Sequence, residues 1–163
     1  MDAGGPGEQG VTGMLKLIDP ALNADVLYAL KAMGHGDDLI ICDANFPAKA
    51  TARLTALGRL LRIDNVTSAR AVKAILSLMP LDSFVEHAVL RMEVGGKPDE
   101  IPPVQAEVQK EIDAAEGKSL LMGSIERFAF YELAKKAFCV VQTGERRFYG
   151  CFALKKGVIP PDA

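Results

Sequence analysis

The chain has two histidines, and histidine is the side chain that most readily gives and takes protons near neutral pH. His35 stands between glycines in Gly34-His35-Gly36-Asp37, where an expected helix ends and an expected strand begins. Glycines allow unusual dihedrals and close approach of a ligand, so His35 is a candidate acid or base. The alternative is that this segment is only a glycine-rich helix C-cap and that His35 is an exposed histidine without a catalytic role. His87 begins an expected strand, where a structural or surface role suits it better.

Two aspartates follow apolar segments. Asp43 comes directly after residues 39–42, a continuous apolar run that predicts a strand covered on both faces. Ligands of open α/β sheets bind outside the carboxyl ends of the strands, so Asp43 is a candidate sugar or base contact. An Asx turn that opens the next loop is the alternative. Asp82, after Pro80-Leu81, poses the same choice, with the turn favoured.

Further candidates lie near the carboxyl end of the chain. Arg127 and Tyr131 stand four apart on an expected helix, so their side chains share a face and can meet one ligand. An ordinary helix start with a surface arginine is the alternative. Tyr149 and Cys151 stand two apart on an expected strand and should project from one face, while Gly150 lets a group approach the other. A half-buried strand with a bulge fits these residues too.

The cysteines and histidines predict no metal site, because two distant histidines and three unclustered cysteines match no ligand spacing. Cys42, Cys139 and Cys151 are odd in number and form no C-x-x-C, so we expect reduced thiols in a cytoplasmic protein. The sequence contains no glycine-rich phosphate-binding loop, which would follow a strand and begin a helix. Gly34-His35-Gly36 has the opposite arrangement, because it follows an expected helix and precedes an expected strand.

Composition narrows the class of protein. The 163 residues are 49% hydrophobic and 25% charged with a net charge of -2, which predicts one soluble domain with a real core. Scattered basic pairs argue against a nucleic-acid partner, and no apolar run nears the roughly 20 residues that span a bilayer. The first residues lack a signal peptide pattern. We expect residues 1–13 to be a disordered tail and residues 14–163 to be the domain.

Segments whose apolar residues recur with a helical period alternate along the chain with segments that have the period of a strand. This alternation is typical of an α/β layer protein. Residues 138–143 and 148–154 are expected to be two strands joined by a turn at 144–147. The expected helices cover residues 24–33, 67–79, 102–116 and 127–137. The other expected strands cover residues 39–42, 59–63 and 87–94.

Taken together, several segments resemble the RbsD/FucU family of sugar mutarotases, most closely its L-fucose branch. They are Met33-Gly34-His35-Gly36-Asp37, Asp43-Ala44-Asn45-Phe46-Pro47, Leu78-Met79-Pro80-Leu81-Asp82, Glu126-Arg127-Phe128-Ala129-Phe130-Tyr131-Glu132 and Thr143-Gly144-Glu145-Arg146-Arg147-Phe148-Tyr149-Gly150. The resemblance implies an α/β/α sandwich that forms a decameric ring with sites near subunit contacts, and no cofactor.

The resemblance also implies roles for single residues. His35 matches the family's proton donor, and Asp43, Arg127 and Tyr131 match sugar-site residues. Asp82 matches an aspartate implicated in eukaryotic members. The family triplet Tyr-Gly-Asn reads Tyr149-Gly150-Cys151 here, and cysteine offers a sugar hydroxyl weaker hydrogen bonds than asparagine does.

The expected reaction is interconversion of sugar anomers through ring opening, with the monosaccharide as the only partner besides copies of the chain. We expect His35 to donate to the ring oxygen and Tyr131 or a water to handle the anomeric hydroxyl. Asp43, Arg127 and Tyr149 would hold the other hydroxyls. Three alternatives remain: a ribose pyranase of the same family, a non-catalytic monosaccharide-binding protein, and a thiol enzyme that uses Cys151.

Overall fold

The computed structural model describes residues 15–163, so the predicted disordered tail at residues 1–13 lies outside the described residues. Within this range the strands are β1 (Asp38–Cys42), β2 (Leu60–Ile63), β3 (Val89–Met92), β4 (Gly123–Ile125), β5 (Cys139–Thr143) and β6 (Phe152–Lys155). The helices are α1 (Ala24–Ala32), α2 (Ala48–Ala52), α3 (Ser68–Leu76), α4 (Pro103–Glu116) and α5 (Arg127–Lys135). None of these described helices has the length and apolar character needed to cross a bilayer.

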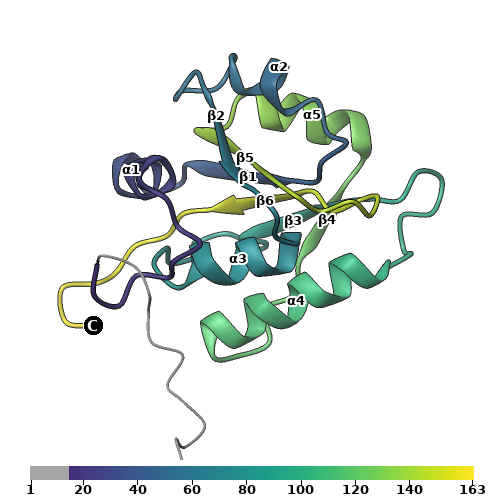
Figure 1. Cartoon of the computed structure of the whole chain (residues 1–163). Helices are drawn as coiled ribbons and strands as arrows, with labels where there is room; N and C mark the ends of the chain where they lie inside the picture. The colour runs from purple at the N-terminus through teal and green to yellow at the C-terminus, as the bar shows by residue number, and fades with distance from the viewer. Residues whose placement is uncertain (1–14) are drawn as a thin grey trace, which may run out of the picture.

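The strands form one sheet in the order β2-β5-β1-β6-β3-β4. β6 runs antiparallel to its two neighbours, β1 and β3, whereas β2 with β5, β5 with β1, and β3 with β4 pair in parallel. The carboxyl ends of the other five strands therefore meet at one edge of the sheet, on the right of Figure 1. Ligands of open α/β sheets bind at such an edge.

Helices cover both faces of the sheet, with α2 and α5 above it and α3 and α4 below it in Figure 1. One buried cluster joins α1, α3 and α4 to one face, and it includes Leu39 and Ile41 of β1. The other joins α2 and α5 to the opposite face and includes Ile40 and Cys42. Successive side chains of a strand point to opposite faces, so β1 is apolar throughout because both faces are covered. This arrangement confirms the predicted α/β/α sandwich.

The helix ends follow local signals that the sequence carries. Asn23 caps α1, because its side chain accepts the Val26 N–H at 3.0 Å, and Thr67 caps α3 in the same way. Gly117 ends α4 in the left-handed conformation, with φ 67°. α3 ends at Leu76, earlier than predicted, since its C-cap Ser77 turns its hydroxyl back to the Ala74 carbonyl at 2.6 Å.

The predicted hairpin at the carboxyl end is wrong, because β1 lies between β5 and β6 in the sheet. Residues 148–151, predicted to begin the last strand, belong instead to the loop that precedes β6. There the Gly150 N–H donates to Asp43 Oδ2 at 3.2 Å, and the Tyr149 carbonyl accepts from Gln105 Nε2 at 3.1 Å. Side chains of distant segments thus take the place of strand partners, and the loop reaches the edge where the parallel strands end.

Candidate active site

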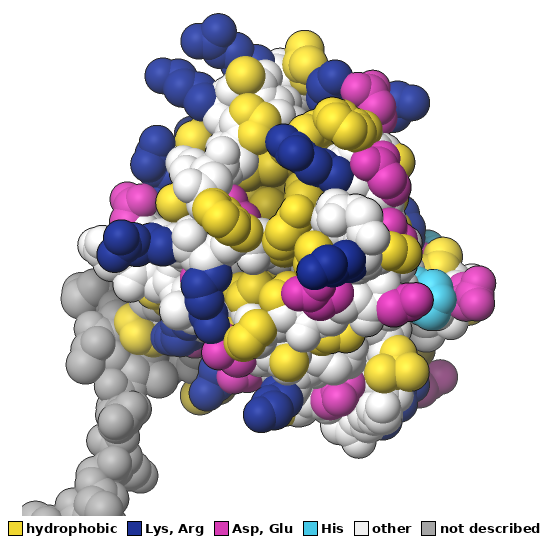
Figure 2. Space-filling model, turned by 90° about the vertical axis from the view of Figure 1, so that its right-hand side faces the viewer, with side chains coloured by type: hydrophobic (Ala, Val, Ile, Leu, Met, Phe, Trp, Pro, Cys, Tyr) yellow, Lys and Arg dark blue, Asp and Glu magenta, His cyan; other side chains and the backbone are white. Residues whose placement is uncertain are grey.

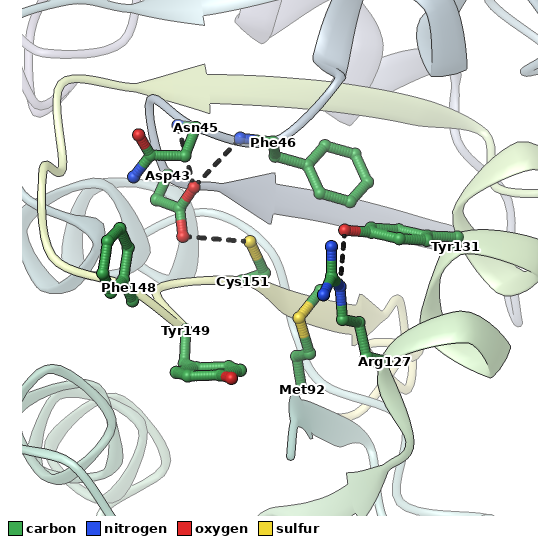
Figure 3. Close-up of a pocket in the computed structure, with 9 residues that line it drawn as sticks. All are labelled: Asp43, Asn45, Phe46, Met92, Arg127, Tyr131, Phe148, Tyr149 and Cys151. Carbon is green, nitrogen blue, oxygen red and sulfur yellow. Dashed lines mark hydrogen bonds between the residues drawn. The ribbon is translucent and has the colours of Figure 1, made fainter. Parts of the chain in front are cut away.

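A cavity of about 280 Å³ opens at the carboxyl edge of the sheet. Figure 2 shows that side of the molecule, where hydrophobic side chains surround a hollow bordered by charged ones. An apolar cavity with a few convergent polar groups is the usual form of a small-molecule site. Figure 3 shows its lining, which is Asp43, Asn45, Phe46, Met92, Arg127, Tyr131, Phe148, Tyr149 and Cys151.

Asp43 is the hydrogen-bonding centre of this cavity (Figure 3). Its Oδ1 accepts the N–H groups of Asn45 at 3.0 Å and Phe46 at 3.1 Å, which is the Asx turn that the sequence left open. Its Oδ2 accepts from the Gly150 N–H at 3.2 Å and from the Cys151 thiol at 3.4 Å. The carboxylate is 4% exposed, so it shapes the loop after β1 and also lines the cavity.

The Cys151 thiol acts as a hydrogen-bond donor. Burial, aided by the negative charge of Asp43, raises the pKa of this thiol well above its ordinary value. The thiol therefore keeps its proton, and its S–H group donates a hydrogen bond to Asp43 Oδ2, which Figure 3 marks with a dashed line. A thiolate is the nucleophilic form of cysteine, so this environment opposes thiol catalysis.

Gly150 lies behind the cavity lining and is itself buried. A Cβ at this position would come within 2.9 Å of Glu145 Cγ and 3.0 Å of Ser68 Oγ. Ser68 also donates to the Gly150 carbonyl at 2.8 Å. Close packing against these two side chains explains the glycine: the groups that it lets approach are Glu145 and Ser68, and Gly150 itself is not among the residues that line the cavity.

Arg127 and Tyr131 meet at the start of α5, as their spacing predicted. Arg127 Nε donates to the Tyr131 hydroxyl oxygen at 3.0 Å, and this bond raises the pKa of the guanidinium. The Tyr131 ring packs 5.4 Å from the Phe46 ring, centroid to centroid. Glu126 caps α5 by accepting the N–H groups of Phe128 and Ala129, which fixes the first turn that carries Arg127.

Tyr149 enters the cavity from an unusual backbone conformation. Its φ of 62° lies in the left-handed region, which residues other than glycine seldom adopt. Its hydroxyl oxygen accepts the Gly95 N–H at 3.1 Å, and its carbonyl accepts from Gln105. Tyr149 and Cys151 both line the cavity, although the strand geometry on which that prediction was based is wrong.

His35 and Asp82 form a pair of their own. His35 Nε2 lies 3.0 Å from Asp82 Oδ1, and the histidine side chain is 44% exposed while the aspartate is buried. Asp82 Oδ1 also accepts the Phe84 N–H at 3.0 Å. The hydrogen bonds from Phe84 and His35 hold the pKa of Asp82 below its ordinary value. An ionised Asp82 therefore orients the His35 ring.

β1 separates this pair from the cavity within one chain, because His35 precedes the strand and Asp43 follows it. The strand has five residues, which at about 3.3 Å each extend over roughly 16 Å. The structure thus brings together Asp43, Arg127, Tyr131, Tyr149 and Cys151, and it leaves His35 and Asp82 outside that group. His87, at 3.3 Å from the Leu121 carbonyl, also lies elsewhere.

Four lining residues were assigned no role from the sequence. Asn45, Phe46 and Phe148 lie within segments that carry the family resemblance, and Met92 ends β3. The signal for Met92 is its place at the carboxyl end of a parallel strand, the same rule that pointed to Asp43. Among residues 15–163, no group of three or more His, Cys, Asp or Glu side chains is placed to hold a metal ion.

The fold and the cavity define an α/β sandwich protein whose ligand cavity, at the carboxyl edge of the sheet, carries an aspartate, an arginine and two tyrosines. The chain belongs to the RbsD/FucU family: the model described as the "RbsD / FucU transport protein family" matches residues 16–159. A fucose mutarotase of Danio rerio is 41% identical over 154 residues, covering 91% of this chain and 97% of the relative. An L-fucose mutarotase of Glaesserella parasuis is 38% identical over 90% and 97%.

Solved structures agree with this placement. A protein described as a putative sugar binding protein is 67% identical, with a TM-score of 0.89 over 92% of this chain and 99% of that one. The fucose mutarotase from Streptococcus pneumoniae, solved in complex with L-fucose, is 36% identical, with a TM-score of 0.80 over 90% and 100%. Bacillus subtilis RbsD complexed with D-ribose is 21% identical, with a TM-score of 0.62 over 85% and 95%, and this likeness concerns the fold alone.

Proposed function

We propose that this protein is a mutarotase that interconverts the α and β anomers of L-fucose. The observation that carries the proposal is the Arg127–Tyr131 hydrogen bond beside the Asp43–Cys151 pair in one small cavity. A donor-rich arginine, two phenols and a carboxylate suit a ligand covered with hydroxyl groups. Relatives named as fucose mutarotases, and a similar structure solved with L-fucose, support this sugar over others.

The reaction needs proton transfers only. A proton leaves the anomeric hydroxyl, a proton reaches the ring oxygen, and the C1–O5 bond breaks to give the open aldehyde. Rotation about the C1–C2 bond then presents the other carbonyl face, and closure of the ring reverses both proton transfers. The balance is complete without an oxidant, a reductant or a cofactor. General acid and base groups of this kind contribute about 10²–10⁴-fold to a rate.

Tyr131 is the proposed group at the anomeric hydroxyl. On ring closure Tyr131 is proposed to give its proton to the carbonyl oxygen that becomes the anomeric hydroxyl, and on ring opening to take that proton back. Its oxygen accepts from Arg127 Nε, so the guanidinium charge stabilises the negative charge that Tyr131 carries between the two transfers. Tyr149 and the Asp43–Cys151 pair, on other walls of the cavity, are proposed to hold the remaining hydroxyls. Phe46 and Met92 offer the apolar surface that the sugar's C–H faces need.

His35 is the proposed donor to the ring oxygen, supplied to the cavity by a second copy of the chain. Its exposed ring, its buried partner Asp82 and its position beyond β1 support a contact between subunits. Exposed apolar side chains lie next to His35 (Phe84, 73% exposed) and next to the cavity (Phe128 and Phe148). Such residues are common at subunit interfaces. The proposed assembly is the homodecameric ring that the family resemblance implies.

A cytoplasmic location is part of the proposal. All three cysteines are free and buried, which suits a reducing compartment. The pKa of Cys139 is raised to about 12 by burial, and burial raises the pKa of Cys42 as well. Buried thiols with a raised pKa seldom form the reactive thiolate, so Cys42 and Cys139 contribute to packing.

Other candidate functions have less support. A ribose pyranase is the nearest, but the structure solved with D-ribose is 21% identical to this chain, whereas the one solved with L-fucose is 36% identical. A thiol enzyme would need an ionised Cys151 beside His35, whereas Cys151 donates to Asp43 and the ring of His35 bonds Asp82. A non-catalytic monosaccharide-binding protein would share the cavity and differ only in lacking activity.

Magnetisation-exchange proton NMR on equilibrated sugars tests the function. Faster α/β exchange of L-fucose with catalytic protein, and a smaller effect on D-ribose, is the expected result. Equal or greater acceleration on D-ribose selects the pyranase. Saturation transfer from protein to L-fucose without faster exchange selects the binding protein.

A further inference from the structure

We infer that Gln105 is a positioning residue for the sugar site, which it serves by holding Tyr149; this rests on the proposed function. Gln105 lies in the first turn of α4, and its side chain is fully buried. It is absent from the cavity lining, so it acts through its neighbours and not by touching the sugar.

The amide of Gln105 joins two segments that line the cavity. Its Nε2 donates to the carbonyl of Met92, at the end of β3, at 2.8 Å and to the carbonyl of Tyr149 at 3.1 Å. The two N–H groups of the amide are thus both used. One side chain therefore sets the spacing between the end of β3 and the loop that carries Tyr149.

Arg91 fixes the direction of this amide. The guanidinium of Arg91 is buried, and its Nη1 donates to Gln105 Oε1 at 3.2 Å. Its other acceptors are the uncharged carbonyls of Pro98, at 2.8 Å, and Glu100, at 3.4 Å. A guanidinium can only donate and a carbonyl can only accept, so Oε1 must face Arg91 and Nε2 must face the carbonyls. The positive charge of Arg91, whose Nη1 donates to Oε1, also polarises the amide and strengthens Nε2 as a donor.

Tyr149 is held at both ends as a result. Its carbonyl is bonded to Gln105, and its hydroxyl oxygen accepts the Gly95 N–H at 3.1 Å. Its φ of 62° is unfavourable for tyrosine, so external bonds must maintain it. With the oxygen occupied by Gly95, the phenolic proton is the group left to meet a sugar hydroxyl. Loss of the Gln105 bonds would let the loop relax and would misplace that proton.

Gln105→Met keeps the length of the side chain and removes its hydrogen bonds. We expect the KM for L-fucose to rise about tenfold, the worth of one or two such bonds, with kcat changed less than about threefold. The matched control is Gln109→Met, one turn later on α4, because Gln109 bonds Asp113, Leu120 and Met122 instead of the cavity segments. The control should leave KM unchanged. An unchanged KM in folded Gln105→Met, or an equal rise in the control, overturns the inference.

A second test asks whether the effect passes through Tyr149. In the Tyr149→Phe background the hydroxyl to be positioned is absent, so Gln105→Met should raise KM much less than it does in the wild type. Effects that multiply independently would contradict the inference. If the methionine variant folds poorly, Gln105→Glu gives the same test. It keeps an acceptor for Arg91, but it places an oxygen where Nε2 donates to the carbonyls of Met92 and Tyr149.

A sugar-free measurement separates this inference from the proposed function. Hydrogen exchange of the Gly95 amide should become at least about tenfold faster in Gln105→Met and stay constant in Gln109→Met, because the amide bonds the Tyr149 hydroxyl. Unchanged Gly95 exchange would contradict the inference even if the wild type is an active mutarotase. Faster Gly95 exchange in Gln105→Met, combined with a wild-type protein that shows no mutarotase activity, would uphold the inference and reject only the proposed function.

Discussion

Arg127 Nε lies 3.0 Å from the hydroxyl oxygen of Tyr131, one helical turn further along α5, and donates a hydrogen bond to it. The guanidinium carbon also lies 5.5 Å from the centre of the Tyr131 ring. The arginine thereby fixes the phenol and leaves the phenolic proton free to point into the cavity. This geometry is the basis for assigning Tyr131 to the anomeric hydroxyl.

Arg127→Met should lower kcat/KM for L-fucose anomer exchange by about 10²–10³-fold, the usual effect of losing one preorganised charge-stabilising donor. The reason is that Tyr131 loses the cation that stabilises its developing negative charge. Magnetisation-exchange NMR measures the rate. Lys136→Met, which removes an exposed cation at the other end of α5, is the control and should keep the wild-type rate. Equal rates in both variants would refute the role of Arg127.

The three thiols should resist alkylation in the native protein. Burial raises the pKa of each, so at pH 8 the reactive thiolate is scarce and shielded. We expect iodoacetamide, followed by mass spectrometry, to modify none of them within minutes under native conditions and all three in guanidinium chloride. Rapid native modification of Cys151 with loss of activity would revive the thiol-enzyme alternative.

The Glu145–Arg147 pair should give a stability that depends on pH. Burial opposes ionisation of Glu145, but hydrogen bonds from Arg147 and from the Ser68 N–H outweigh it and hold the pKa of Glu145 below its ordinary 4.5. Because the folded pKa is depressed, the stabilisation is present above pH 4.5 and is lost as the pH falls through the folded value.

Arg147→Met should therefore lower the free energy of unfolding at pH 7 by about 1–3 kcal/mol, because it leaves a buried carboxylate short of donors. The lower part of this range applies, since Arg147 is 41% exposed and solvent screens its charge. Urea unfolding at pH 7 and pH 4 should show the difference from wild type shrinking at the lower pH. Glu107→Gln, which removes the negative charge and one of the two acceptor oxygens from the exposed pair with Arg147, should cost less than about 1 kcal/mol. A difference that grows on acidification would contradict this account.

Much of the fold was predictable because its signals are local. Asn23, Thr67 and Gly117 mark helix ends through bonds within a few residues, and the unbroken apolar character of β1 indicates two covered faces. α2 and β4 were not predicted. They have five and three residues, too short for a period to emerge.

Part of the cavity was predictable from simple rules. Asp43 follows the carboxyl end of a strand, where ligands of open α/β sheets bind, and Arg127 and Tyr131 stand four apart on one face of a helix. The loop at 148–151 was not predictable, because its conformation is set by Asp43 and Gln105, which lie more than 40 residues earlier in the chain. Nothing in the pattern around Tyr149 signals a left-handed φ. The separation of His35 from the cavity depends in the same way on strand direction, which periodicity does not give.

If His35 serves the cavity of a neighbouring subunit, two inactive variants should restore each other. His35 precedes β1, and Arg127 lines the cavity beyond its other end. If each site takes the two residues from different copies, assemblies with equal amounts of the His35→Ala and Arg127→Met chains should form intact sites at about one position in four. Co-expression, followed by NMR of the purified mixed assembly, measures the recovery. Activity no higher than the mean of the two separate variants would contradict the supply of His35 by a neighbouring subunit.

The most direct test of the central claim is the α/β exchange rate of L-fucose at equilibrium, measured by magnetisation-exchange NMR across a series of protein concentrations. The account predicts a rate that rises linearly with the concentration of wild-type protein and falls nearly to the uncatalysed value with His35→Ala, while circular dichroism shows both proteins folded. A rate that does not depend on the concentration of folded wild-type protein would contradict the account.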